Sequence, residues 1–172
     1  VDGDITDTLF ITRLLVDYKP DKFFNMAAMS HVGQSFEQPE ATFKINALAV
    51  INQLEAIRKF SPSTKYYQAS TSELFGGLKC PTTGYTESSP FHPRSPYGVA
   101  KMAAYWAVVN HREAYGLHAC NGLLFNHESS RRGSDFVTRK ITLGVAAIVQ
   151  GKCDKITLGN LDAYRDWGYA AD

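Results

Sequence analysis

Short apolar runs alternate with longer segments of helical period along this chain, and this alternation most restricts the folds it can adopt. The runs with the length and composition of strands are 22–27, 64–70, 119–125 and 155–158. The segments that we predict to be helices are 6–18, about 40–60, 96–115 and 135–150. Strands and helices in this order build right-handed βαβ units, so we predict an α/β fold with a parallel sheet and helices on both faces.

Two of these helices carry an apolar face that indicates packing against a core. In the helix at 40–60 the apolar positions recur at steps of four and three, at Phe43, Ala47, Val50, Leu54 and Ile57. In the helix at 135–150 we expect the inward positions to be Val137, Ile141, Ala147 and Ile148. The Gly- and Pro-rich residues 76–94 are predicted to form a loop long enough to be functional or mobile.

The overall composition excludes several classes of protein. The formal net charge of +1 gives no electrostatic reason to expect a nucleic-acid or membrane partner. No apolar run approaches the roughly 18 residues of a membrane-spanning helix, and the first residues do not read as a signal peptide. Cys80, Cys120 and Cys153 are far apart and show no zinc-like spacing with histidines, so we expect reduced thiols in a cytoplasmic protein and no metal site.

Polar residues follow three of the predicted strands. These clusters are Ala27–His31, Ser70–Glu73 and Asn126–Glu128. In sheets of this kind ligands bind beyond the carboxyl ends of the strands, so we expect the three clusters to converge on one edge. Read alone, Ser70–Glu73 is as well explained by a turn rich in serine and threonine, with Glu73 in solvent.

The segment Ser95–Lys101 (SPYGVAK) adds a candidate catalytic pair. Ser95 is a good helix N-cap and Pro96 fits the first turn, so Tyr97 and Lys101 fall one turn apart on the same helix face. A free phenol has a pKa of about 10 and is a poor base, but a neighbouring ammonium lowers that pKa. A YxxxK pattern is more often structural than catalytic, and here the hydroxyls and carboxylate of 70–73 favour chemistry.

Other polar residues in the second half are candidates for binding a ligand. Asn126 and His127 follow a predicted strand and are suited to orient a cofactor or substrate, although a hydrogen-bonded turn explains His127 equally well. Arg132 belongs to an Arg-Arg-Gly sequence (131–133) of the kind that can meet a phosphate. Lys140 and Arg165 fit contacts with a diphosphate, and an exposed surface position explains each of these cations too.

Taken together, these motifs resemble the GDP-mannose 4,6-dehydratase family of the extended short-chain dehydrogenase/reductase superfamily. The matching stretches cover nearly the whole chain and are GDITD (3–7), AAMSHV (27–32), YQASTSELFG (67–76), PRSPYGVAK (93–101), ACNGLLFNHES (119–129), RRG (131–133), FVTRKIT (136–142) and LGNLDAYRDWG (158–168). The YxxxK pattern alone indicates only the superfamily, whereas STSEL, FNHES, RRG and RDWG together indicate the family. The resemblance implies a Rossmann-like doubly wound parallel sheet, here truncated at both ends, that binds NADP.

The resemblance also implies roles for four residues in a dehydration that begins with an oxidation. Tyr97 would remove the proton of the sugar 4-hydroxyl while NADP⁺ takes the C4 hydride, and Thr71 would hydrogen-bond the 4-oxygen or the phenol. Lys101 would hold the nicotinamide ribose and lower the pKa of Tyr97. Glu73 would take the C5 proton that the new ketone acidifies, water would leave from C6, and the hydride would return to C6.

The same resemblance assigns the remaining candidates to cofactor or substrate. The implied cofactor-binding residues, besides Tyr97 and Lys101, are Asp4, Ile5, Met26, Ala27, Ala28, Met29, Ser30, His127 and Arg132. The implied GDP-mannose-binding residues are Ser72, Asn126, Lys140 and Arg165. The resemblance further suggests a homodimer or homotetramer, with the start of the substrate-binding region at about 126–172.

Two other interpretations stay open. Another nucleotide-sugar dehydratase or an epimerase, for example one acting on dTDP-glucose, has the same fold, although an epimerase needs no carboxylate at Glu73. A non-catalytic fragment of the fold is the second. Because the sequence has no GxxGxxG-type loop and runs only from Val1 to Asp172, we expect a piece of a longer enzyme that by itself binds NADP poorly and has no activity.

Overall fold

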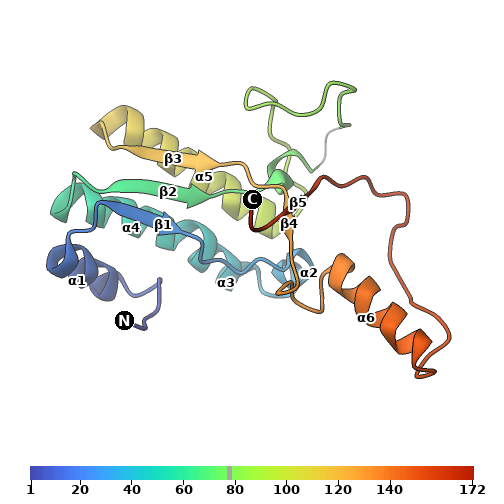
Figure 1. Cartoon of the computed structure of the whole chain (residues 1–172). Coiled ribbons are helices and arrows are strands. Elements are labelled where there is room, and N and C mark those ends of the chain that lie inside the picture. The colour runs from blue at the N-terminus through green and yellow to red at the C-terminus, as the bar shows by residue number, and fades with distance from the viewer. Residues whose placement is uncertain (77–78) are drawn as a thin grey trace. The chain divides into compact units, whose positions relative to one another are not determined.

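The computed structural model describes residues 1–76 and 79–172, and these form two compact units (Figure 1). Unit 1 is Val1–Leu124 and unit 2 is Phe125–Asp172. All four predicted catalytic residues lie in unit 1. Part of the predicted loop at 76–94 lies outside the described residues.

Unit 1 is built on a three-stranded parallel sheet (Figure 1). Its strands are β1 (Lys22–Asn25), β2 (Lys65–Ala69) and β3 (Ala119–Gly122), in the order β1-β2-β3. The prediction of parallel strands joined by helical crossovers is confirmed. β1 ends earlier than predicted because the chain beyond Asn25 turns away and Met29 bonds to a helix residue, Asn46.

α5 (Pro96–Tyr115), which carries Tyr97, begins and ends as predicted. The Ser95 hydroxyl accepts a hydrogen bond from the Gly98 N–H at 3.0 Å and caps the helix. The helix ends at Gly116, whose φ of 69° lies in the left-handed region that glycine adopts without strain. The cap fixes where the first turn of α5 starts, and therefore where Tyr97 stands.

The segment predicted as one helix at 40–60 is interrupted. It consists of α3 (Pro39–Phe43), a π-helical turn η1 (Lys44–Leu48) and α4 (Ala49–Phe60), preceded by a short helix α2 (Val32–Glu37) that the sequence analysis did not identify. The predicted apolar stripe is buried from Ala47 onward, but Phe43 is 39% exposed. The wider π turn also brings Asn46, which is 1% exposed, into the interior.

The core of unit 1 lies on one face of the sheet. Its buried side chains come from α1 (Thr8–Tyr18), α4, α5 and the strands, and include Ile11, Leu15, Val50, Leu54, Ile57, Tyr66, Ala104 and Val108. Successive strand residues point to opposite faces, so Phe24, which follows Phe23 of this core, points the other way and is 60% exposed. α1, α4 and α5 thus form one helical layer, on the face of the sheet that carries the core. These three helices do not contribute to the layer that the sequence predicts on the opposite face.

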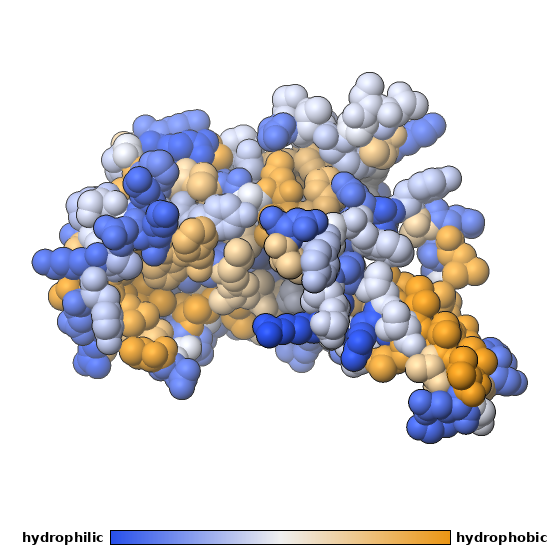
Figure 2. Space-filling view, in the orientation of Figure 1, coloured by the Kyte–Doolittle hydropathy of each residue, from blue (hydrophilic) through white to orange (hydrophobic). Residues whose placement is uncertain are grey.

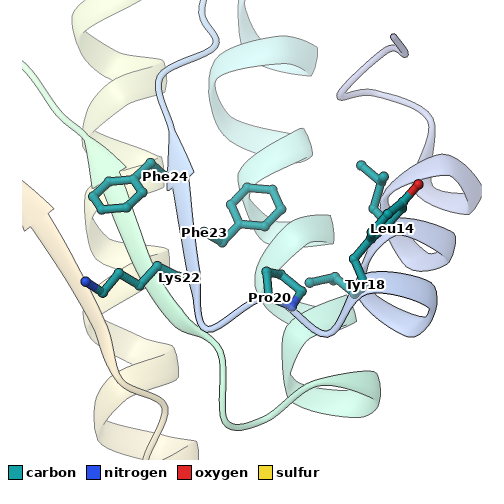
Figure 3. Close-up of a pocket in the computed structure, with 7 residues that line it drawn as sticks. Leu14, Tyr18, Pro20, Lys22, Phe23 and Phe24 are labelled. Carbon is teal, nitrogen blue, oxygen red and sulfur yellow. The ribbon is translucent and has the colours of Figure 1, made fainter. Parts of the chain in front are cut away.

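A cavity of about 290 Å³ lies at the edge of this sheet, between β1 and α1 (Figure 3). Its lining is Leu14, Leu15, Tyr18, Pro20, Lys22, Phe23 and Phe24. None of the predicted site residues lines it, so this cavity is separate from the candidate site.

Unit 2 contains a two-stranded parallel sheet, β4 (Asn126–Glu128) and β5 (Trp167–Tyr169), and one longer helix, α6 (Val137–Val149). The predicted strand at 155–158 is wrong, because Ile156 instead packs on α6 at Gly144, where a Cβ would stand 2.6 Å from the isoleucine.

The expected burial of α6 is also wrong. None of its predicted inward residues, Val137, Ile141, Ala147 and Ile148, is buried. Unit 2 places little chain against the helix, which therefore presents an apolar surface (Figure 2).

In the part of the chain that the structure describes, every helix is too short or too polar to cross a lipid bilayer. Within residues 1–76 and 79–172, no three His, Cys, Asp or Glu side chains gather as ligands of a metal ion would. Cys80, Cys120 and Cys153 are exposed free thiols.

Candidate active site

The predicted catalytic residues come from two neighbouring elements of unit 1, the end of β2 and the start of α5. Beyond Ala69 the chain passes through Ser70 and Thr71 into a short 3₁₀ helix, η2 (Ser72–Phe75). The Thr71 hydroxyl accepts a hydrogen bond from the Glu73 N–H at 3.2 Å and so caps η2. This cap holds the Thr71 hydroxyl and the backbone of Glu73 together.

The first turn of α5 packs directly on η2. A Cβ at Gly98 would stand 3.2 Å from the Glu73 carbonyl oxygen and 3.0 Å from Pro93 Cβ. The missing side chain at Gly98 therefore lets α5 approach η2, and this approach brings Tyr97 close to Glu73.

Tyr97 is 8% exposed, and its phenol interacts with both Thr71 and Glu73. Burial raises the pKa of Tyr97 above its ordinary value of 10.0, a hydrogen bond with the Thr71 side chain opposes the rise, and the Glu73 carboxylate adds to it by repulsion. The structure thus brings Thr71, Glu73 and Tyr97 together, and in these surroundings the phenol keeps its proton.

Lys101 lies one turn further along α5 and is 3% exposed. Its amine donates a hydrogen bond to the Ala69 carbonyl oxygen at 3.0 Å and lies 5.9 Å from the centre of the Tyr97 ring. Burial lowers the pKa of Lys101 from 10.5 to about 8. The pKa of Tyr97 is raised because burial dominates at the phenol, and the lowering of this pKa by the Lys101 ammonium stays a prediction.

A buried polar atom beside these residues has no partner in the described chain. It is the hydroxyl of Ser70, which follows β2 and is 5% exposed. An unpaired buried hydroxyl costs about 1–3 kcal/mol, so a bound polar group is favourable there. The end of β2 is therefore suited to a ligand with hydroxyl or amide groups.

The residues after β1, Met26–Ser30, are held by a buried asparagine that sequence reasoning missed. Asn46 accepts a hydrogen bond from the Met29 N–H and donates one to the Met29 carbonyl oxygen, both at 2.9 Å. The signal for it was a polar residue inside the apolar stripe, between Phe43 and Ala47. Asn46 thus fixes the chain that leaves the carboxyl end of β1.

The other predicted ligand residues of unit 1 lie near α1 and in η2. Asp4 is exposed and accepts a hydrogen bond from the Thr6 N–H at 2.8 Å, which lowers the pKa of Asp4. Ile5 beside it is half-buried. Ser72 is half-buried, and its N–H donates to the Leu124 carbonyl oxygen at 2.9 Å.

The predicted residues of unit 2 form a separate group. Asn126 and His127 were predicted to follow a strand. They instead belong to a strand, β4, because this segment stays extended to pair with β5. The exposed His127 has its Nδ1 2.9 Å from the Phe125 carbonyl oxygen. Lys140 and Arg165 are exposed. The convergence of this cluster with those of β1 and β2 stays a prediction.

Arg132 is the unit 2 candidate with the most defined surroundings. Its Nε lies 3.4 Å from the Glu128 carboxylate, and its guanidinium lies 3.7 Å from the centre of the Phe136 ring. The Glu128 carboxylate also accepts a hydrogen bond from the Thr138 hydroxyl. These contacts orient the arginine on unit 2.

The group in unit 1 has the parts needed for proton transfer at a substrate. A phenol, a hydroxyl and a carboxylate meet beside a buried amine at the carboxyl end of a parallel sheet. The phenol and hydroxyl suit exchange of a proton with a substrate hydroxyl, and the carboxylate suits removal of a proton from carbon.

Solved structures show which class of fold this is. RMD from Pseudomonas aeruginosa, complexed with NADPH, has a TM-score of 0.89 at 24% identity, over 97% of this chain and 57% of that one. DesIV from Streptomyces venezuelae, a dTDP-glucose 4,6-dehydratase in double-mutant form with NAD and DAU bound, has a TM-score of 0.85 at 24% identity, over 100% of this chain and 51% of that one. The chain thus has the Rossmann-like α/β fold of these proteins.

The sequence comparison narrows this class to one family. The model of the family described as GDP-mannose 4,6 dehydratase matches residues 1–172, and the chain belongs to that family. A GDP-mannose 4,6-dehydratase of Vibrio cholerae is 56% identical over 172 residues, which are 99% of this chain and 46% of that protein. GDP-mannose 4,6 dehydratase 1 of Arabidopsis thaliana is 51% identical over 174 residues, 99% of this chain and 47% of that protein. The chain therefore spans about half the length of these relatives.

Proposed function

We propose that the protein containing this chain is an NADP-dependent GDP-mannose 4,6-dehydratase, which converts GDP-mannose to GDP-4-keto-6-deoxy-mannose for 6-deoxyhexose synthesis. The observation that carries the proposal is the meeting of Thr71, Glu73 and Tyr97 beside Lys101, in a chain that belongs to this family. The names of relatives 51% and 56% identical support it.

In the proposed reaction Tyr97 and Thr71 act at C4 of the sugar. Tyr97, as phenolate, would receive the proton of the 4-hydroxyl, and the Thr71 hydroxyl, which interacts with the phenol, would also bond to the 4-oxygen. Because burial raises the pKa of Tyr97, the positive charge of Lys101 has to act on the phenol when the proton moves. When bound, NADP supplies the acceptor for the C4 hydride and gives the hydride back at C6.

Glu73 acts at C5. The ketone at C4 acidifies the C5–H, so the carboxylate would take this proton while the C6–O bond breaks, and the proton that Tyr97 received from the 4-hydroxyl would leave with the C6 oxygen as water. The carboxylic acid then returns a proton to C5, and the net change is the loss of one water. Both steps require that one hexose contacts Glu73 and Tyr97, and the half-buried position of Glu73 and its electrostatic effect on Tyr97 support this requirement.

NADP is the cofactor in this proposal. The residues that would contact it are Tyr97, Lys101, Asp4, Ile5, Met26, Ala27, Ala28, Met29, Ser30, His127 and Arg132. The unpaired Ser70 hydroxyl supports a polar ligand at the end of β2, and the NADPH complexed with the P. aeruginosa neighbour supports the choice of dinucleotide.

The rest of the proposal concerns the sugar nucleotide and the assembly. Ser72, Asn126, Lys140 and Arg165 would contact GDP-mannose, with 126–172 as the start of the substrate-binding region. Free exposed cysteines support a cytoplasmic location. Exposed apolar side chains on α4 and α5, such as Ile51 and Trp106, support a homodimer or homotetramer.

The test is a graft in which residues 1–172 replace the matching stretch of the V. cholerae relative. The grafted protein should consume GDP-mannose with NADP and not dTDP-glucose, whereas the isolated chain should consume neither. Tyr97→Phe should lower kcat of the graft by roughly 10²- to 10⁴-fold. Tyr105→Phe, on the same helix, is the matched control and should keep most of the activity.

Three outcomes would change the proposal. Turnover of dTDP-glucose alone would indicate another nucleotide-sugar dehydratase. Full activity of the Tyr97→Phe graft would remove the catalytic role of this cluster. Turnover by the isolated 172-residue chain would show that the chain itself is a complete enzyme.

A further inference from the structure

A chain of buried polar side chains runs from α4 through β2 to the amine of Lys101. Gln53, Tyr66 and Gln68 are its members, and Asn25 of β1 joins it from the side. Each of these side chains is at most 2% exposed. Polar groups are rarely this buried unless they are hydrogen-bonded, so a connected set of them inside a core requires an explanation.

Tyr66 is the centre of this network. Its hydroxyl lies 2.8 Å from the amide of Gln53 and 2.8 Å from Oε1 of Gln68. Burial raises the pKa of Tyr66, so the hydroxyl keeps its one proton. One proton serves one acceptor at a time, so the Tyr66 hydroxyl donates either to Oε1 of Gln53 or to Oε1 of Gln68, each 2.8 Å away.

Gln68 passes the network on to the candidate site. Its Oε1 accepts from Asn25 Nδ2 at 2.9 Å and lies 2.8 Å from the Tyr66 hydroxyl, so its amide is fixed. Its Nε2 then donates to the Ala69 carbonyl oxygen at 2.9 Å, the same oxygen that accepts from Lys101 Nζ at 3.0 Å. Two donors thus occupy the two lone pairs of one carbonyl.

The position of this carbonyl explains why it needs support. The last pair between β1 and β2 is Asn25 with Gln68, so Ala69 lies one residue beyond the paired part of β1. On the β3 side the same peptide is held by the Ser70 N–H, which donates to the Gly122 carbonyl oxygen at 2.9 Å. On the β1 side the Ala69 carbonyl oxygen accepts from two side chains, those of Gln68 and Lys101. Lysine has a long side chain with about 2 kcal/mol of rotamer entropy, so its amine stays in place only if its acceptor does.

We propose that Gln68 is a positioning residue for Lys101: it holds the Ala69 carbonyl, and that carbonyl holds the amine at the start of the site. The catalytic importance of Lys101 in this proposal rests on the proposed function. The contacts of Gln68 and Lys101 with the Ala69 carbonyl oxygen do not depend on that function. Gln68 contacts no reacting atom in this account and acts only through Lys101.

The first experiment measures the pKa of Lys101 in the 172-residue chain, by NMR titration of its Cε signal, in Gln68→Met and Tyr66→Phe variants. Gln68→Met should free the amine to reach water, so the pKa of Lys101 should rise by about one unit or more toward its ordinary value of about 10.4. Tyr66→Phe breaks the network before Gln68, so it should lower the stability and leave the pKa of Lys101 near that of the unmodified chain.

A purely structural role predicts a different pattern. In that case both variants would lose stability and both would keep the pKa of Lys101, and this result would overturn the proposal. If Gln68→Met loses the dispersed spectrum of a folded chain, Gln68→Asn replaces it. That variant keeps an amide but is one methylene too short to reach the Ala69 carbonyl, and the same rise in pKa is expected.

The second experiment uses the grafted enzyme and separates this proposal from the proposed function. Gln68→Met should lower kcat by roughly 10- to 100-fold with little change in KM for GDP-mannose, because the amine is misplaced but the sugar site is intact. An inactive unmodified graft would count against the proposed function, and the titration of Lys101 would still decide the role of Gln68. An active graft in which Gln68→Met keeps kcat would count against Gln68 alone.

Discussion

Asn46 makes two hydrogen bonds to a single residue, Met29, one to its N–H and one to its carbonyl oxygen, both at 2.9 Å. This pair joins η1 to the chain that leaves β1. We predict that Asn46→Ala lowers the free energy of unfolding by about 1–3 kcal/mol, because it leaves backbone groups of Met29 without their partner. Faster hydrogen exchange of the Met29 amide would accompany the loss.

The control for this change is Asn52→Ala, on α4. The Asn52 amide donates to the Thr8 hydroxyl at 3.2 Å in an exposed position, so its loss should change stability by less than about 0.5 kcal/mol. Equal effects of the two substitutions in urea unfolding would show that the Met29 contact is unimportant.

Gly98 is predicted to tolerate no larger residue. Since a Cβ there would already stand 3.0 Å from Pro93 Cβ and 3.2 Å from the Glu73 carbonyl oxygen, Gly98→Val should force α5 and η2 apart and cost about 1–3 kcal/mol. Gly159→Val is the matched control, because no atom lies within 4 Å of a Cβ at that position. Urea midpoints of the two variants should differ clearly, and coinciding midpoints would contradict the close packing of these two elements.

Lys101 should make the stability rise with pH above neutrality. The pKa of Lys101 is about 8 in the folded chain, whereas an exposed lysine in the unfolded chain has a pKa of 10.5. Between these values the unfolded chain binds more protons, so the free energy of unfolding increases with pH, by about 3 kcal/mol in total. Above about pH 10 the trend should reverse, because burial raises the pKa of Tyr66 and Tyr97 and the unfolded chain then loses protons first.

Lys101→Met provides the check on that profile. The variant should be more stable than the unmodified chain at pH 7, where folding buries a charged amine, and the difference should close by about pH 10. Chemical unfolding at several pH values measures both curves, and parallel curves would show that the buried amine does not control the slope.

Glu55 should also make the stability rise with pH, but in the acid range. Its carboxylate is hydrogen-bonded to Arg58 at 2.9 Å and also contacts Lys59 and His111. These contacts, of which the hydrogen bond with Arg58 has the largest effect, lower the pKa of Glu55 from 4.5 to about 2. The stabilisation is complete above pH 4.5 and is lost as the pH falls through 2. Because the Glu55 carboxylate is 31% exposed, solvent and salt weaken this stabilisation. Glu55→Gln should flatten this part of the acid unfolding curve, and an unchanged curve would assign the acid sensitivity to other carboxylates.

Local signals made much of the fold of unit 1 predictable. The ends of α5 follow from Ser95 and Gly116, because capping depends on residues within one turn of the helix end. The π turn at 44–48 does not follow from local signals, and Asn46 within it bonds to Met29, which lies 17 residues earlier in the chain. β4 was missed for a similar reason: it is a strand only because it pairs with β5, far along the chain.

The candidate site was predictable in its residues but not in its electrostatics. The helix period placed Tyr97 and Lys101 one turn apart, and the strand end placed Thr71 and Glu73 near them. The pKa of each group depends instead on burial and on the acceptor that a side chain finds. No local pattern indicated that the amine of Lys101 would bond to Ala69, because that carbonyl is shared through a network spanning β1, β2 and α4.

β1 stands at one margin of its sheet with a bulky aromatic, Phe24, facing outward. A strand bonded along one side offers its other row of amides and carbonyls to any extended chain that it meets. Preparations of this polypeptide by itself should therefore self-associate increasingly as they are concentrated, and dilute samples will be the ones in which its folding can be measured.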